Sequence, residues 1–199
     1  LKQNNADAGE VDHHMAMMND NIKQLKMEFN QTDRQVSETN YDLVLNWTTA
    51  LSNQSHISIG SAIKQKAPSY QEQYLWFPMQ ATGGLADGRT YIGNINLESE
   101  TAYQFNLGYK HQGDKFILSP NLFYQEIDNY IQATPSTNMT ANMVGTMMMG
   151  NTPLQFANVD AELFGADITA RYQLNEQLVL SAVASYVRGK RLDIDDNLY

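Results

Sequence analysis

The clearest pattern in the chain is a strict alternation of apolar and polar side chains near its middle. Tyr, Phe, Leu and Tyr occupy positions 103, 105, 107 and 109, and polar residues or glycine fill the positions between them and position 110. Successive residues of a β-strand point to opposite faces, so this segment is predicted to be a strand with one apolar and one polar face. Such a strand fits a soluble β-sandwich, and it also fits a membrane barrel that has lipid on one side and a wet lumen on the other.

Similar runs of alternating apolar and polar residues recur along the chain. Long and short connections alternate between these runs. Predicted strands cover 41–51, 57–63, 103–110, 116–124, 164–172 and 178–186, and residues 1–11 contain the end of a further strand. Short turns are predicted at Ser52–Ser55, Gln112–Asp114 and Asn175–Gln177. The long connections span about 11–38, 66–98 and 135–152, and a short helix is predicted within the first of them, at 22–29. This alternation of short turns and long connections is typical of outer-membrane barrels, in which one rim has short turns and the other carries long loops.

The same alternation predicts which side chains share a face of the sheet. The convex, apolar face is expected to carry Leu43, Leu45, Trp47, Phe105, Leu107, Leu122 and Ile168, and the concave face Asn46, Gln104, Asn106, Asp167 and Arg171. Aromatic residues of the apolar face fall into two groups. One group lies beside the short turns (Tyr109, Phe116, Tyr172) and the other lies nearer the long loops (Tyr103, Tyr124, Phe164, Tyr186). Two such groups are expected to form girdles at the two membrane interfaces, although aromatic residues also favour strands in general.

Three motifs occur in order along the chain. They are Lys66-Ala67-Pro68-Ser69-Tyr70-Gln71-Glu72; Gly93-Asn94-x-Asn96-Leu97-x-x-Glu100-Thr101 before the strand that ends in Gly108-Tyr109; and Phe156-Ala157-Asn158-Val159-Asp160 with Leu163-Phe164-Gly165-Ala166-Asp167. Together they resemble sequence signatures of the TonB-dependent outer-membrane receptors. The resemblance extends over nearly the whole chain, and the order of the motifs agrees with the alternation of long and short connections.

The resemblance implies an all-β fold, an antiparallel transmembrane β-barrel of the 22-strand type whose lumen is filled by a plug. Residues 1–199 would then be an open fragment of about seven strands, and the plug and the final barrel strands would be absent. The implied location is the bacterial outer membrane, in contact with its lipid. The implied function is active uptake of a scarce ligand, such as an iron-siderophore or other metal complex, energised by TonB through the missing plug.

Composition excludes several other classes of protein. The formal net charge of −9 disfavours nucleic-acid binding, because no basic face is available to displace counterions from phosphate. The chain has no cysteine, which excludes disulfides, thiolate metal sites and cysteine nucleophiles. No apolar run of about 18 residues is present, so no transmembrane helix is predicted. No catalytic constellation and no cofactor motif is found, and an enzyme is therefore not expected.

The methionines suggest one kind of metal chemistry. All ten fall in the predicted long connections, and two histidines adjoin the first group. Thioether sulfur and imidazole nitrogen together suit copper, especially Cu(I). The candidate ligands are His13, His14, Met15, Met17, Met18, Met143, Met147, Met148 and Met149. The alternative is that methionine serves as adaptable apolar packing in loops that cover a plug.

The loops also contain a group of aromatic residues. Tyr74, Trp76 and Phe77 are the candidates for a ligand mouth. Two functions from other classes remain open on the sequence alone. One is a passive porin or adhesin barrel without energy coupling, and the other is a soluble β-sandwich that binds glycans through these three aromatic residues.

Overall fold

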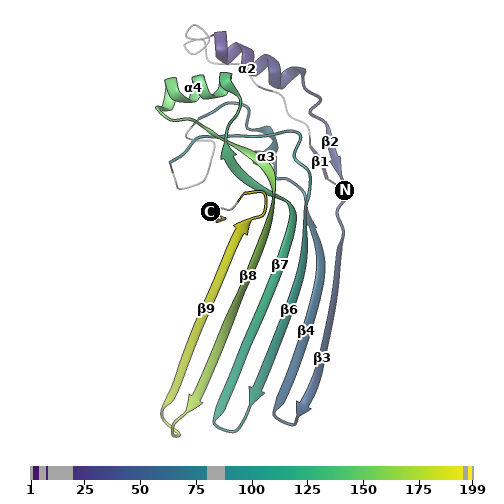
Figure 1. Cartoon of the computed structure of the whole chain (residues 1–199), viewed down its shortest axis with the longest axis vertical. Coiled ribbons are helices and arrows are strands. Elements are labelled where there is room, and N and C mark those ends of the chain that lie inside the picture. Colours follow the sequence, from purple (N-terminus) through teal and green to yellow (C-terminus); the bar gives the residue numbers. More distant parts are fainter. Residues whose placement is uncertain (1, 5–7, 9–19, 80–87, 195–196, 199) are drawn as a thin grey trace. The chain divides into compact units, whose positions relative to one another are not determined.

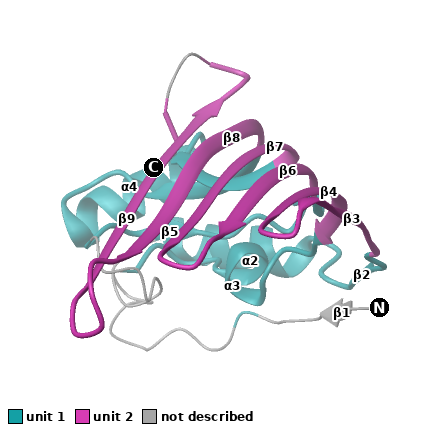
Figure 2. Cartoon of the chain, turned by 90° about the horizontal axis from the view of Figure 1, so that it is seen from below, with its two compact units in different colours: residues 1–40, 66–100, 130–158 teal, residues 41–65, 101–129, 159–199 magenta. Residues whose placement is uncertain are grey.

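The computed structural model describes residues 2–4, 8, 20–79, 88–194, 197 and 198. The chain divides into two compact units, each built from segments that are separate in sequence (Figure 2). Unit 1 comprises residues 1–40, 66–100 and 130–158, and unit 2 comprises residues 41–65, 101–129 and 159–199. The two units are described in turn.

Unit 2 is a sheet of three antiparallel hairpins (Figure 1). β3 (Asp42–Ser52) pairs with β4 (Ser55–Lys66), β6 (Glu100–Gln112) with β7 (Phe116–Pro135), and β8 (Leu154–Gln173) with β9 (Val179–Arg191). The strand order is β3-β4-β6-β7-β8, and β9 lies on the other side of β8 as its partner. Strands that follow one another in sequence therefore pair, as the alternating pattern predicts.

The three short turns lie at one rim of this sheet. The backbone N–H of Gln112 donates to the carbonyl of Gln54 at 2.7 Å, which joins the first turn to the second. The N–H of Gln173 donates to the carbonyl of Lys115 at 2.8 Å, which joins the second turn to the third. The opposite ends of the strands continue into the long connections. The predicted placement of the turns is confirmed.

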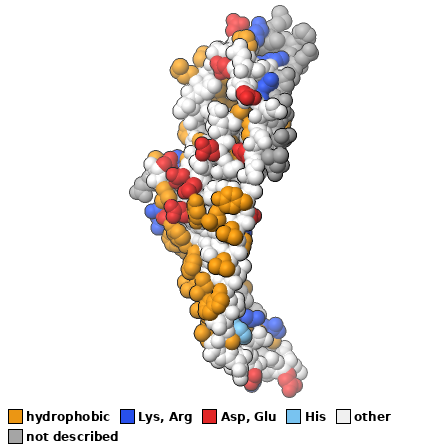
Figure 3. Space-filling model, turned by 90° about the vertical axis from the view of Figure 1, so that its right-hand side faces the viewer, with side chains coloured by type: hydrophobic (Ala, Val, Ile, Leu, Met, Phe, Trp, Pro, Cys, Tyr) orange, Lys and Arg blue, Asp and Glu red, His pale blue; other side chains and the backbone are white. Residues whose placement is uncertain are grey.

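Strand register confirms the predicted separation of the two faces. Leu45 pairs with Ser61, Phe105 with Tyr124 and Leu107 with Leu122, whereas Asn46 pairs with Gly60 and Gly108 with Asn121. On the polar face the Asn121 side-chain amide donates to the Asp167 carboxylate at 3.1 Å. The apolar face is left open by the chain itself: Leu45 is 69% exposed and Trp47 is 55% exposed. Figure 3 shows apolar side chains gathered over the strands.

The apolar face ends at a row of polar and charged side chains. The Tyr124 hydroxyl donates to the Glu162 carboxylate at 3.4 Å, and Lys190 forms an ion pair with the same carboxylate at 3.1 Å. Glu126 lies on the same face, opposite Tyr103. Tyrosine has an apolar ring and a polar tip, so Tyr103 and Tyr124 suit the boundary between lipid and water.

Unit 1 contains all the helices in the described part of the chain. These are α2 (Asp20–Gln31), α3 (Tyr70–Tyr74) and α4 (Met139–Met149), and none of them is long and apolar enough to cross a membrane. Three short strands accompany them: β1 (Lys2–Asn4), β2 (Val36–Glu38) and β5 (Tyr91–Ile92). β1 and β2 pair antiparallel, whereas β5 pairs parallel to the start of β8 and is the exception to the predicted antiparallel sheet.

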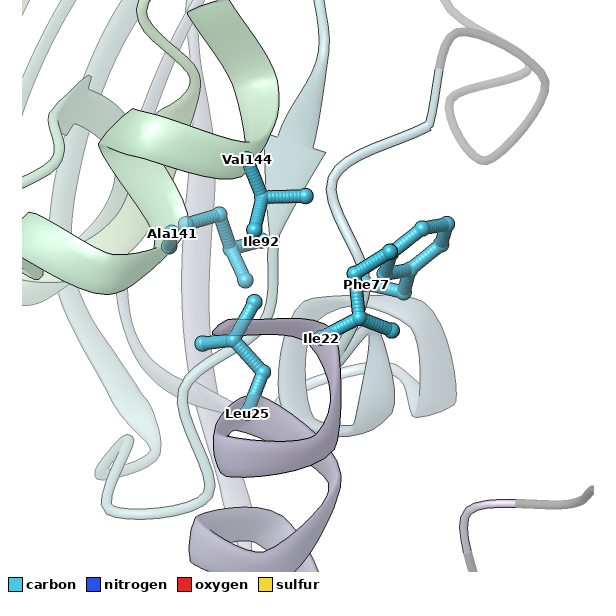
Figure 4. Packing of buried hydrophobic residues seen from close by; sticks show 6 residues of the cluster. All are labelled: Ile22, Leu25, Phe77, Ile92, Ala141 and Val144. Carbon is cyan, nitrogen blue, oxygen red and sulfur yellow. The ribbon is translucent and has the colours of Figure 1, made fainter. Parts of the chain in front are cut away.

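One apolar cluster joins the three segments of unit 1. It consists of Ile22, Leu25, Phe77, Ile92, Ala141 and Val144, with α2 packed against α4 (Figure 4). The helix predicted at 22–29 is confirmed within α2. The long methionine-rich connection predicted at 135–152 contains a helix over residues 139–149 that the sequence did not predict. Methionine is a good helix former, Asn138 caps the helix N-terminus, and Gly150 ends it in the left-handed conformation (φ 72°).

Candidate ligand site

A pocket of about 280 Å³ opens in unit 1. Four segments of the chain line it: the last turns of α2 with Thr32, three residues of the segment 73–76, residues 92–96, and single residues of the 130–158 segment. Its side chains are mainly amides and aliphatic groups, with two aromatic rings. The lining residues are Leu25, Glu28, Phe29, Thr32, Gln73, Leu75, Trp76, Ile92, Gly93, Asn94, Ile95, Asn96, Asn138 and Gln155.

Backbone hydrogen bonds fix two of these segments to each other. The N–H of Gly93 donates to the Leu75 carbonyl at 2.5 Å, and the N–H of Asn94 donates to the Glu72 carbonyl at 2.8 Å. Position 93 must be glycine for this approach, because a Cβ there would lie 2.7 Å from the backbone of Gln73. The Gly-Asn pair of the second sequence motif therefore forms one wall of the pocket.

A capping box holds the segment that precedes this wall. Ser69 accepts a hydrogen bond from the N–H of Glu72, and the Glu72 carboxylate accepts one from the N–H of Ser69. This reciprocal pair starts α3 directly after Pro68. The first sequence motif, Lys66 to Glu72, thus sets the direction in which the chain enters the pocket.

The three aromatic residues predicted for a ligand mouth have different positions. Trp76 lines the pocket and lies against Phe29, with ring centroids 6.4 Å apart. Tyr74 and Phe77 are only 5% and 7% exposed and do not line the pocket. The Tyr74 hydroxyl donates to the carbonyl of Arg34 at 2.8 Å. Burial, with smaller contributions from Tyr70 and Glu38, raises the pKa of Tyr74, which keeps the hydroxyl protonated as a donor.

Sequence reasoning missed Phe29 and the amides of the pocket. The Asn94 side chain accepts the N–H of Asn96 at 3.0 Å, and the Asn138 side chain accepts the N–H of Ala141 at 3.0 Å. The Gln155 amide donates to the Gly93 carbonyl at 3.5 Å. Amides held in this way offer a ligand both donors and acceptors beside the aromatic platform of Phe29 and Trp76. The Gly93-Asn94-x-Asn96 motif could have identified Asn94 and Asn96, and no signal in the sequence marked the others.

The predicted metal ligands fall into two sets. His13, His14, Met15, Met17 and Met18 lie outside the described residues. Met143, Met147, Met148 and Met149 belong to α4, which turns by about 100° per residue and therefore directs the last three to different sides. Met139, Met143 and Met147 are spaced by four residues and share the exposed side of the helix, with exposures of 80%, 53% and 63%. In the described part of the chain no group of three or more His, Cys, Asp or Glu could hold a metal ion.

Comparison with known proteins decides the family. The family described as "TonB dependent receptor-like, beta-barrel" matches residues 13–198. The chain belongs to the TonB-dependent receptors. The predicted family and fold class are therefore confirmed, and the soluble β-sandwich is excluded. A search of curated proteins found no match.

Solved TonB-dependent receptors share this fold. Copper transporter OprC is 19% identical, with a TM-score of 0.65 over 85% of this chain and 23% of its own. The siderophore receptor PirA from Pseudomonas aeruginosa is 23% identical, with a TM-score of 0.61 over 75% of this chain and 28% of its own. The ferric enterobactin receptor PfeA from Pseudomonas aeruginosa is 22% identical, with a TM-score of 0.53 over 73% of this chain and 21% of its own. The chain thus spans about a quarter of the length of these receptors.

Family membership places the chain in the outer membrane of a bacterium. The sheet of unit 2 is a segment of the TonB-dependent receptor barrel, and its exposed apolar face lies against lipid. The opposite face, with Asn121 and Asp167, lines the lumen. The family consists of receptors and transporters.

Proposed function

We propose that this chain is part of a receptor that imports a scarce ligand, an iron-siderophore or other metal complex, with energy supplied through TonB. The observation that carries the proposal is the match of the TonB-dependent receptor barrel to residues 13–198. Support comes from structural neighbours described as a siderophore receptor and a ferric enterobactin receptor. The pocket beside Trp76 offers a rigid aromatic and amide surface on which one arm of a chelate could rest.

Uptake by intact cells tests the proposal. A strain that lacks the full-length receptor should lose uptake of radioactive iron from its cognate chelate, and the wild-type gene should restore it. Uptake should also stop when TonB is deleted while the receptor is still present. Iron uptake that continues without TonB would favour a passive porin, and unchanged uptake without the receptor would overturn the proposal.

A second candidate function is the uptake of copper, and the exposed methionines of α4 favour it. Methionines four residues apart on a helix have Cβ atoms about 5–6 Å apart, so two thioethers can reach one Cu(I) ion. Met143 forms such a pair with Met139 and another with Met147. Soft donors from the histidine- and methionine-rich segment at 13–18 would complete the coordination. One structural neighbour is described as a copper transporter.

Titration of the full-length receptor with Cu(I) tests this second candidate. Replacing Met139, Met143 and Met147 by Leu keeps the apolar volume and removes the sulfur atoms, so copper affinity should fall at least tenfold. Met27→Leu is the matched control, because Met27 is an exposed methionine of α2. Equal copper binding by the triple variant and the wild type would show that these sulfur atoms are not ligands.

A further inference from the structure

The described lining of the pocket beside Trp76 has one negatively charged side chain and no positively charged one. Glu28 is the one charged residue in its described lining, and Lys, Arg and His are all missing from that lining. The remaining polar groups are the amides of Gln and Asn, one threonine and the backbone. A ligand that enters this pocket therefore meets neutral dipoles and one carboxylate.

Three basic side chains of unit 1 pair with residues outside the lining of the pocket, and Lys26 and Arg89 do not line it either. Lys66 pairs with Glu72 at 3.7 Å and with the largely buried Glu100 at 3.3 Å. Arg34 donates to the side chain of Asn30 at 2.8 Å and lies over the ring of Phe29, 5.6 Å from its centre. On α2, Lys23 pairs with Asp20, and neither Lys23 nor Lys26 lines the pocket.

The sequence of unit 1 shows how its charged residues are distributed. Residues 130–158 contain no charged residue, and over its whole length unit 1 has eleven acidic residues and six basic ones. The described residues of unit 1 include seven of these acidic residues and all six basic ones, so the sign of the charge at the pocket is set by Glu28 in its lining. Clefts dominated by one sign of charge raise the local concentration of ligands of the opposite sign and repel ligands of the same sign.

We infer that this pocket selects uncharged or cationic metal chelates and rejects polyanionic ones. The inference rests on the proposed function and narrows its ligand class. Charge balance separates the two main kinds of ferric chelate: three hydroxamate groups, each −1, neutralise Fe³⁺, whereas three catecholate groups, each −2, leave a charge of −3. Recognition of the trianion needs Arg or Lys to form charge-assisted hydrogen bonds. A neutral chelate needs only amide partners and an apolar platform, and this pocket has both.

Binding to the full-length receptor tests the inference with two defined probes. One probe is a neutral ferric tris-hydroxamate and the other is a ferric tris-catecholate trianion, both labelled with radioactive iron and measured by equilibrium dialysis. The wild type should bind the hydroxamate at least about tenfold more tightly than the catecholate. Glu28→Lys should reduce that preference about tenfold or more, because it replaces a repulsive charge by an attractive one at the pocket.

Asp20→Lys is the matched control. Asp20 lies on the same helix and is fully exposed, and it does not line the pocket. This charge reversal should leave the ratio of the two affinities within about twofold. An equal shift in both variants would show that a general surface field, rather than the pocket, sets the preference, and would overturn the inference.

Other outcomes separate the inference from the function on which it rests. Tighter binding of the catecholate by the wild type would overturn the charge preference and leave metal-chelate uptake standing. A preference for the hydroxamate that Glu28→Lys does not alter would overturn the assignment to this pocket. If the receptor binds neither probe and supports no TonB-dependent iron uptake, the proposed function itself is wrong.

Discussion

Gly165 is the position at which the barrel segment should tolerate a side chain least. It lies in β8 opposite Val187 of β9. A Cβ at this position would meet the ring of Phe123 at 2.6 Å and would come closer still to the backbone carbonyl oxygen of Tyr186. Carbon atoms normally pack at about 3.5–4.0 Å, so about 1 Å of movement is needed. The ring can move only partly and the carbonyl belongs to a paired strand, so β8 and β9 would have to separate locally.

The expected effect of Gly165→Ala combines two opposing contributions. Overpacking of a well-packed site costs about 1–3 kcal/mol, and replacing glycine in a strand recovers about 0.5–1 kcal/mol of backbone entropy. The free energy of unfolding should therefore fall by about 1 kcal/mol, and by up to about 2.5 kcal/mol if overpacking reaches its upper range. Urea unfolding of the full-length receptor reconstituted in lipid vesicles measures this change.

Gly108→Ala is the matched control on the same face of the sheet. Its Cβ would approach the hydroxyl of Ser58 at 2.5 Å, and that hydroxyl can rotate away because it belongs to a side chain. The change in stability should stay within about 0.5 kcal/mol. If both variants are equally stable, or if Gly165→Ala is more stable than the wild type, the steric argument is wrong.

Three further predictions concern other parts of the chain. Glu100→Ala should lower the free energy of unfolding of the full-length receptor in urea by about 2 kcal/mol, because the Glu100 carboxylate accepts the N–H of Ile131 at 2.8 Å. An unchanged free energy of unfolding would show that this hydrogen bond does not stabilise the fold. Residues 1–199 expressed alone should aggregate, since β3 and β9 leave unpaired edges, and a cooperative thermal transition of a soluble monomer would contradict this. Hydrogen bonds from Arg191 lower the pKa of Asp193 below its ordinary value of 3.8. The ionised Asp193 therefore stabilises the folded state fully above pH 3.8, and this stabilisation is lost as the pH falls through the lowered pKa. A ¹³C titration of the Asp193 carboxyl should show this lowered pKa and its return in Arg191→Gln.

The strands could be predicted from sequence because lipid on one side and water on the other impose a period of two. That signal ends where the sheet leaves the apolar zone. β7 continues to Pro135, well past the predicted end at Tyr124, and β8 begins at Leu154, ten residues before the predicted start. In these extensions apolar residues such as Ile127, Ile131 and Val159 are buried without a strict alternation of apolar and polar positions, so a period of two no longer marks the strands. Asn129 interrupts β7 with a left-handed conformation (φ 58°), and its N–H donates to the side chain of Asp160.

The candidate site was harder to predict than the sheet. Trp76 was recognised because a large aromatic residue in a loop is conspicuous, but Tyr74 and Phe77 look the same in sequence and are buried. Whether an aromatic residue faces a ligand or a core depends on segments far away in the chain. Phe29 of α2 and Asn138, which caps α4, both line the pocket although they lie more than a hundred residues apart in sequence. Amides have no periodic signature, and only the Gly93-Asn94-x-Asn96 motif marked some of them.

The shared apolar cluster of unit 1 has a consequence for how the long loops of this receptor can evolve. Ile22 comes from the first loop, Phe77 from the second and Val144 from the third, and all three are buried in one cluster. An insertion or a volume change in one loop therefore alters the packing of the other two. The loops should accumulate compensating substitutions and be inherited as a set. Grafting a single loop from a relative would leave its apolar residues without their packing partners, whereas exchanging all three loops together would transfer the apolar cluster intact.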